Sequence, residues 1–475
     1  MNKMENMEIK QLVVSMSLPI IISMVIQALY NIVDSIFVAK ISSDALTAVS
    51  LCYPVQTIMI AIACGTAVGF NTLLARYLGE KKFDYANNTM MHGILLGFVY
   101  GLVFLVLGLL FSNAFLSWFT SDSNVVSLAN TYIRICTMFS FSVFVQIIFE
   151  RIMQATGNAI YNMVMQGAGA IINIILDPIL IFGWFGLPEM GVAGAAIATV
   201  IGQFCAMLIG YVITKVKIKE LDIHIHNFSF SIPILCKIYK VGVPAILMQS
   251  VLSFMTVFMN MILAPISAMA ITVFSVYYKL QNFLNMAVLG ITNALIPIVA
   301  YNNGANRKDR AIEAIQFSMI LSIFIMAVGT IVFQLFPKQL LAMFSANDQM
   351  YGLGIPALKI ISLSFVFAGI SMVLCAAFQA LNKANTSLVI TLARQLVILI
   401  PLTYGLMKCF GIHVGWYAFV VTEFICTMYS LFEWRKIKRD VQQRRFSTAA
   451  CTDDSQELSF LHMQFQLIQH RMLLK

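Results

Sequence analysis

Long apolar stretches recur along the whole chain and are separated by short polar links. Crossing the hydrocarbon core of a bilayer takes about 20 apolar residues. Twelve stretches of roughly that length lie near residues 14–38, 46–75, 91–112, 130–153, 160–183, 191–214, 241–264, 269–300, 312–335, 356–378, 386–407 and 413–434. Only 11% of the residues are charged, whereas soluble domains carry about 25%. The sequence therefore predicts an all-α polytopic membrane protein with twelve transmembrane helices.

Basic residues are concentrated in every second link. The links after even-numbered stretches contain Arg76, Lys81, Lys82, Arg151, Lys215, Lys217, Lys219, Lys237, Lys240, Arg307, Lys308, Arg310 and Lys383, whereas the other links contain only Lys40, Lys338 and Lys408. Cytoplasmic links carry the excess of Lys and Arg in membrane proteins, so we expect both termini in the cytoplasm. Residues 1–10 lack the pattern of a cleaved signal peptide, which predicts a retained first helix in an inner or plasma membrane.

The second half of the chain repeats the first at a constant offset of 225 residues. Pro19 then corresponds to Pro244 and Gly65 to Gly290, and further matches extend over four helices of each half. Each half contains six stretches, an even number, so both halves have the same orientation in the membrane. Transporters built from such parallel repeats bind substrate between their halves and alternate access by rocking them.

The repeat divides the chain into three predicted segments. These are a six-helix N-terminal lobe over residues 1–225, a six-helix C-terminal lobe over 226–445 and a cytoplasmic tail over 446–475. The tail has Leu461 and Phe465 at helical spacing but is too interrupted to span a bilayer. A surface helix and a disordered end both fit its sequence, and we assign it no role.

One acid, Asp34, lies in the middle of the first apolar stretch. Insertion scales put an ionised Asp at the centre of a membrane helix at roughly 2.5 to 3.5 kcal/mol, so such a residue faces the protein interior or a water-filled cavity. Helical spacing places Gln27, Asn31 and Asp34 on one face. At the 225-residue offset Asp34 corresponds to Met259, which is not ionisable, whereas a purely architectural contact is expected in both halves. We therefore predict a functional role for Asp34.

A second acid, Asp177, lies deep in the fifth stretch, one turn after Asn173 and directly before Pro178. Proline removes a backbone donor and can open a helix. Carboxylates in apolar surroundings bind a proton more readily than in water, and carboxylates together with Asn31 and Asn173 also have the chemistry of a Na⁺ site. We predict ion coupling through Asp34 and Asp177 with help from these two amides, and both H⁺ and Na⁺ remain open.

Further polar residues in the stretches are candidates for substrate contact. Glu150 lies near the end of the fourth stretch, with Gln146 and Gln154 one turn to either side, and Lys279 lies deep in the eighth. We predict that Glu150, Gln146, Lys279 and also Asp177 contact substrate. An interhelical pair is the alternative for Glu150 and for Lys279.

Three other charged residues lie within the stretches. Arg134 is near an end of the fourth stretch, where a snorkelling or paired side chain is as well supported as a functional one. Arg394 and Glu423 lie in the second half, and we predict that they form a structural ion pair with each other.

Several kinds of functional site lack support in the sequence. There is no GxxxxGK[ST] phosphate loop and no HExxH motif, and the nine cysteines lie singly without CxxC spacing. We therefore expect no cofactor, no metal site and no enzymatic activity. The formal charge of +9 comes from basic residues in the links, as the positive-inside rule requires, so we expect no nucleic-acid partner.

Four segments of the sequence resemble the MATE family of multidrug and toxic compound extrusion transporters. They are LYNIVDSIFV over Leu29–Val38, NIILDPILIF over Asn173–Phe182, GVAGAAIAT over Gly191–Thr199 and PIVAYNNGA over Pro297–Ala305. The resemblance covers about residues 10–440. It implies twelve helices in two six-helix lobes and export of cationic or amphipathic compounds against an inward H⁺ or Na⁺ gradient.

The resemblance also implies roles for individual acids. Asp34 is similar to the first-helix acid of the family, Asp177 to the fifth-helix acid of its DinF-like branch, and Glu150 to the fourth-helix acid of MepA-like drug exporters. The seventh and tenth helices carry no acid here, which departs from the ion site of the NorM-like branch.

These features together predict a cation-coupled multidrug antiporter, expected to act as a monomer in a lipid bilayer on drugs or toxic cations. The alternative is a flippase for a lipid-linked precursor. A flippase cavity should carry several Arg and Lys for phosphates, and only Lys279 and Arg394 lie deep in the stretches.

Overall fold

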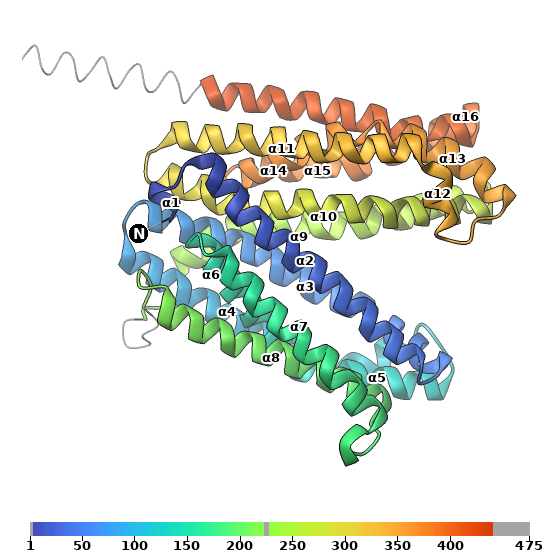
Figure 1. The fold of residues 1–475 in the computed structure, drawn as a ribbon, viewed down its shortest axis with the longest axis horizontal. Coiled ribbons are helices and arrows are strands. Elements are labelled where there is room, and N and C mark those ends of the chain that lie inside the picture. The colour runs from blue at the N-terminus through green and yellow to red at the C-terminus, as the bar shows by residue number, and fades with distance from the viewer. Residues whose placement is uncertain (1–2, 223–227, 440–475) are drawn as a thin grey trace, which may run out of the picture. The chain divides into compact units, whose positions relative to one another are not determined.

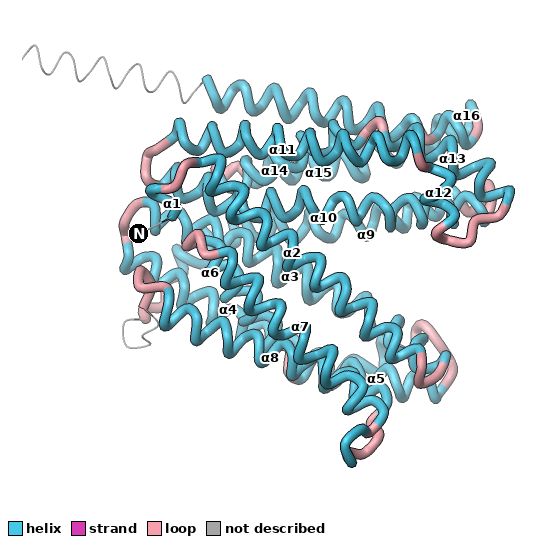
Figure 2. Tube along the Cα trace, in the orientation of Figure 1, coloured by secondary structure: helices cyan, strands magenta, loops and turns pink. Residues whose placement is uncertain are grey.

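The computed structural model describes residues 3–222 and 228–439, and these residues form helices and connecting loops without strands (Figures 1 and 2). Within them, ten helices are long and apolar enough to cross a membrane, and the number is twelve if each of two bent helix pairs is one span. The prediction of an all-α polytopic membrane protein is confirmed. The predicted tail over residues 446–475 lies outside the described residues.

The bounds of the spans follow the predicted stretches closely. In the first half, the spans are α2 (Ile9–Ala39), α3 (Ser43–Gly79), α4 (Phe83–Ser117), the pair α5 (Ser123–Met138) and α6 (Phe141–Ala155), α7 (Ala159–Phe182) and α8 (Gly191–Lys217). In the second half, they begin with α9 (Ile232–Leu263), α10 (Ala268–Gly304), α11 (Lys308–Leu335) and the pair α13 (Asp348–Ser362) and α14 (Phe365–Ala380). Two segments follow: Ala384–Phe410, made of α15 (Ala384–Leu392), η3 (Ala393–Val397) and α16 (Leu399–Phe410), and Ile412–Arg439, which begins with α17 (Ile412–Gly415). Shorter elements are α1 (Lys3–Asn6), η1 (Trp184–Gly186) and α12 (Pro337–Ala342).

The helix bounds reproduce the offset of the sequence repeat. Both ends of α10 lie 225 residues after the corresponding ends of α3, and both bent pairs have the same bend of 48°. The two halves differ where α7 runs unbroken through Pro178, whereas its counterpart is interrupted by the π-helical turn η3. Pro178 therefore does not open its helix.

The chain forms two compact units, Met1–Thr427 and Met428–Lys475. The contacts and cavities described below lie within the first of these units. The predicted division into lobes at residue 225 stays a prediction.

Side-chain caps explain why several helices begin where they do. Ser42 Oγ accepts a hydrogen bond from the Ala45 N–H at 3.0 Å at the start of α3, and Asn347 Oδ1 accepts one from the Met350 N–H at 2.9 Å at the start of α13. A capping side chain satisfies one of the backbone N–H groups that have no partner in the first turn of a helix. Polar caps at these positions allow sharp turns between consecutive spans.

Helices of the two halves pack directly against each other, α3 against α9 and α10, and α2 against α10 (Figure 1). Glycines permit this close approach. Gly69 faces the backbone of Ile238 in α9, and Gly79 faces the Tyr301 carbonyl in α10, so a Cβ atom at either glycine would overlap backbone atoms. These glycines act by close packing within unbroken helices, as small residues commonly do in membrane proteins.

Replacing Gly69 with Val should destabilise this packing. The added side chain would collide with the backbone of α9, and overpacking typically costs about 1–3 kcal/mol. We expect a thermal midpoint in detergent that is several degrees below that of the wild type. The matched control is Gly352→Val, because Gly352 is also helical but has no atom near its virtual Cβ. Equal losses in both variants would show that helix propensity, and not the α3–α9 contact, determines the effect.

Candidate functional site

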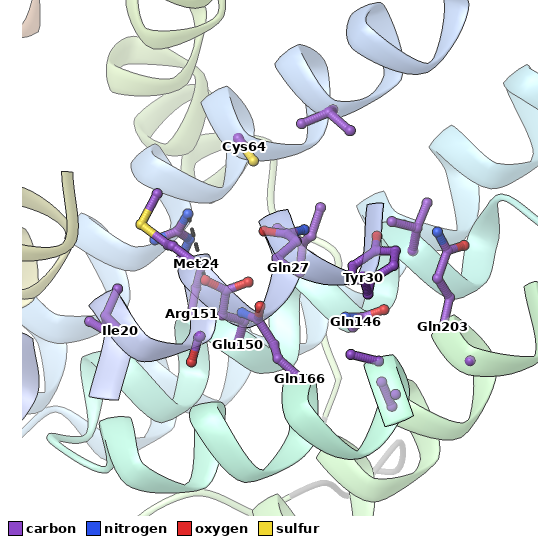
Figure 3. A pocket seen from close by; sticks show the side chains of 18 of the residues that line it. Ile20, Met24, Gln27, Tyr30, Cys64, Gln146, Glu150, Arg151, Gln166 and Gln203 are labelled. Atoms are coloured by element: carbon purple, nitrogen blue, oxygen red, sulfur yellow. Dashed lines mark ion pairs between the residues drawn. The ribbon is translucent and has the colours of Figure 1, made fainter. Parts of the chain in front are cut away.

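A cavity of about 250 Å³ lies among α2, α3, α6, α7 and α8 and also reaches side chains of α9 and α10. Figure 3 shows side chains that line it, including Gln27 and Tyr30 from α2, Gln166 from α7 and Gln203 from α8. Apolar groups such as Ile20 share the lining with these amides. A concave space with an apolar lining and a few polar groups is the usual form of a small-molecule site.

Helix α6 contributes the charged part of this lining. Gln146, Glu150 and Gln154 lie one turn apart, and two of them, the predicted substrate contacts Glu150 and Gln146, line the cavity. Gln154 Nε2 donates a hydrogen bond to Glu150 Oε1 at 3.0 Å. Gln146 Oε1 is buried and has no hydrogen-bond partner within the described residues.

Arg151 lies in the cavity lining, contrary to the prediction from the charge pattern. The charge pattern assigned it to a cytoplasmic link, but it lies inside α6, lines the cavity and is 6% exposed. Its Nη1 donates a hydrogen bond to Gln154 Oε1 at 2.7 Å, and its Nη2 lies 3.9 Å from Glu150 Oε1. The Glu150 carboxylate supplies the opposite charge and the Gln154 amide accepts a hydrogen bond, and this local spacing was the signal available in the sequence.

Asp177 and Asn173 form a buried pair on α7. Asp177 has no exposed surface, and its Oδ1 accepts a hydrogen bond from Asn173 Nδ2 at 3.3 Å. The same Nδ2 lies 3.4 Å from Thr199 Oγ1 of α8. Asn173 and Thr199 line the cavity, whereas Asp177 does not. Asp177 is therefore connected to the cavity through the Asn173 amide.

The polar face predicted on the first span divides in the structure. Gln27 lines the cavity, but Asn31 and Asp34 do not. Asn31 is exposed, and its Nδ2 donates to the Gln27 backbone carbonyl at 2.9 Å. Asp34 is half-buried, and its Oδ1 has no hydrogen-bond partner within the described residues. The two predicted coupling acids thus lie on helices that pack against each other, Asp34 on α2 and Asp177 on α7.

Lys279, predicted to contact substrate, does not reach this cavity. It is exposed on α10 and also lies outside the lining of a second cavity in the second half. Lys279 lies well inside α10, as its position in the apolar stretch predicts. The direction of its side chain, however, depends on how α10 packs. Arg134 also lies outside both linings, and its Nε donates to Ser112 Oγ at 3.3 Å.

The second cavity, of about 120 Å³, contains the predicted ion pair of the second half. Arg394 Nε lies 3.3 Å from Glu423 Oε1, which confirms the predicted pairing. The two side chains are 15% and 12% exposed. Arg394 is part of the π-helical turn η3, and such turns move a side chain relative to a regular helix.

Breaking this pair should cost stability. Replacing Arg394 with Met leaves the Glu423 carboxylate without its opposite charge, and loss of one partner of a buried pair costs about 3 kcal/mol. We expect a lower free energy of unfolding, measured by denaturant titration in mixed micelles. The double variant Arg394→Met/Glu423→Leu should recover most of the loss, because replacing both partners with apolar residues is often neutral. A double variant as unstable as the single one would contradict this assignment.

A sequence model of the MatE family matches the chain over residues 19–179 and 244–405. The two matched ranges begin 225 residues apart, which is the offset of the internal repeat. Together they cover more than half of the chain.

Individual relatives match over most of their length. The multidrug export protein MepA of Staphylococcus haemolyticus is 26% identical over 417 residues, which cover 88% of this chain and 91% of that protein. MepA of Staphylococcus aureus strain bovine RF122 is 26% identical over 420 residues, 87% of this chain and 90% of that protein.

Solved structures show the same fold. An outward-facing multidrug resistance MATE transporter of the MOP superfamily aligns with a TM-score of 0.86 at 25% identity, covering 93% of this chain and 98% of that one. A MATE transporter in a bent conformation aligns with a TM-score of 0.87 at 25% identity and the same coverage of both chains.

Proposed function

The chain belongs to the MatE family of membrane transporters, and we propose that it exports cationic or amphipathic compounds in exchange for an inward-moving H⁺ or Na⁺. The single observation that carries this proposal is the cavity in which Glu150 lies among amide and apolar side chains. Such a lining suits flat amphipathic cations, because the apolar groups take up the ring system and the carboxylate attracts the charge. The relatives named for multidrug export support the same substrate class.

Ion coupling is proposed for the pair of acids beside the cavity. Asp34 and Asp177 lie on the packed helices α2 and α7, and two carboxylates in apolar surroundings favour binding of a positive ion between or onto them. Binding of H⁺ or Na⁺ there would alter the packing of α2 on α7. Because Asn173 connects Asp177 to the lining, the same event would change the cavity and favour release of substrate.

Orientation and location complete the proposal. The distribution of basic residues between the spans supports cytoplasmic termini in an inner or plasma membrane. A flippase for a lipid-linked precursor is less favoured, because the described lining contains one basic residue, Arg151, whereas a phosphate-bearing substrate calls for several.

The test is export of ethidium by purified protein in liposomes under an imposed pH gradient, an imposed Na⁺ gradient or neither. Export driven by either gradient and absent without one supports the proposal and identifies the coupling ion. Folded protein that moves no dye under any of the three conditions would contradict it.

A further inference from the structure

Arg151 lies at one side of the cavity and is fixed there by neutral side chains. Its Nη1 donates to Gln154 Oε1 at 2.7 Å and lies 3.4 Å from Asn293 Oδ1 of α10. The distance from Nη2 to Glu150 is longer, 3.9 Å, and is drawn as a dashed line in Figure 3. The guanidinium thus makes its shorter contacts with two amide oxygens and a longer contact with the carboxylate.

The charges that face the cavity therefore cancel. Among the described lining residues, Glu150 is the one carboxylate and Arg151 the one basic side chain, and Tyr30 and Cys64 are the other titratable groups. Asp34 and Asp177 lie outside the lining. An arginine keeps its positive charge at all physiological pH values, so a cation that binds Glu150 still has Arg151 beside it.

This arrangement has different consequences for one and for two charges on a substrate. A single positive charge can approach the Glu150 carboxylate, which is not the principal hydrogen-bond partner of Arg151. A second positive charge meets no further carboxylate in the described lining and is repelled by the guanidinium. Charge repulsion of this kind is stronger beside a buried side chain such as Arg151 than in bulk water, because the effective dielectric constant is lower there.

We propose that Arg151 is a specificity-determining residue that limits the substrates of this cavity to amphipathic compounds with at most one net positive charge. The inference rests on the proposed export function and deepens it. It assigns a role to a charged residue that faces the substrate space and that the coupling pair does not use.

The test compares ethidium, which carries one positive charge, with propidium, which has the same ring system and a second charge on its side chain. Apparent affinities of both dyes are measured by fluorescence with the purified full-length protein. Wild type should prefer ethidium. In Arg151→Gln the ratio of propidium affinity to ethidium affinity should rise at least tenfold, whereas Arg151→Lys, which keeps the charge, should stay within about threefold of the wild type. These fold-changes follow from adding or removing one nearby charge.

Two further variants keep the test decisive. Arg134→Gln removes an arginine that lies outside the cavity. Its ratio of propidium affinity to ethidium affinity should equal that of the wild type. Gln154→Glu adds a carboxylate beside Arg151 and should raise the ratio even if Arg151→Gln fails to fold. A ratio unchanged in both Arg151→Gln and Gln154→Glu, with ethidium still bound, would overturn the inference. That result would leave the proposed function intact if the wild type exports ethidium, whereas absence of gradient-driven export by wild type would count against the proposed function itself.

Discussion

Replacing Asp34 with Asn is expected to abolish gradient-driven export while leaving dye binding within about threefold of the wild type. Asparagine has nearly the same shape and can make a hydrogen bond, but it can neither take up a proton at physiological pH nor offer a charged ligand to Na⁺. Asp34 lies outside the cavity lining, on α2, which packs against the helix α7 that carries buried Asp177. The substitution therefore removes the coupling ion and leaves the substrate contacts in place. A site that cannot gain and lose the ion cannot convert the gradient into a change of access.

The measurement is ethidium export from liposomes under the gradient that drives the wild type, together with dye binding in detergent. Asp34→Glu should retain part of the export, because it keeps a carboxylate. The matched control is Asp348→Asn, since Asp348 is exposed in the first turn of α13, and it should export normally. Wild-type export by Asp34→Asn would remove Asp34 from the coupling path.

Replacing Glu150 with Gln is expected to weaken binding of a cationic dye at least a hundredfold. Glu150 is the carboxylate that faces the cavity, and Arg151 lies beside it with Nη2 3.9 Å from Oε1. The substitution removes an attractive charge and leaves the guanidinium uncompensated, so the cavity becomes positive. Two unit charges about 4 Å apart interact by about 4 kcal/mol at an effective dielectric constant of about 20. Since about 1.4 kcal/mol corresponds to tenfold in affinity, a hundredfold loss is within reach of this single change.

Binding of ethidium measured by fluorescence anisotropy checks this prediction. Glu189→Gln serves as the matched control, because Glu189 is exposed in the loop after η1, and its affinity should not change. The double variant Glu150→Gln/Arg151→Gln, which has no charge in the described lining, should bind ethidium better than Glu150→Gln alone. Unchanged affinity in Glu150→Gln would place the substrate elsewhere in the molecule.

The spans of this protein were predictable because they are local properties of the sequence. A backbone in a bilayer must satisfy its own hydrogen bonds, so a long apolar stretch has almost no alternative to a helix. The predicted stretches 46–75 and 269–300 accordingly fall inside α3 and α10. The structure extends them at their polar ends, where caps such as Ser42 and not hydrophobicity determine the first turn.

Some features of the sites were also local. The contact of Gln154 with Glu150 follows from helical spacing within α6, and the Arg394–Glu423 pair joins two opposite charges that both lie deep in the second half. An unpaired charge in apolar surroundings costs free energy, so an ion pair between Arg394 and Glu423 is favoured. The pairing required no knowledge of the packing angles.

The sequence by itself thus determined the position of the apolar spans, the repeat and which acids lie within the spans, because length, charge and period are local properties of the chain. Only the tertiary structure decided which of those residues face a common space. It left Lys279 exposed and outside the cavity lining, and it connected Asp177 to the cavity only through the Asn173 amide. It also placed Arg151 in the cavity lining, whereas the charge pattern had assigned that residue to a link. The position of a residue in the sequence fixes the direction of its side chain around the helix axis. What the side chain meets in that direction depends on the packing of neighbouring helices, which come from distant parts of the chain.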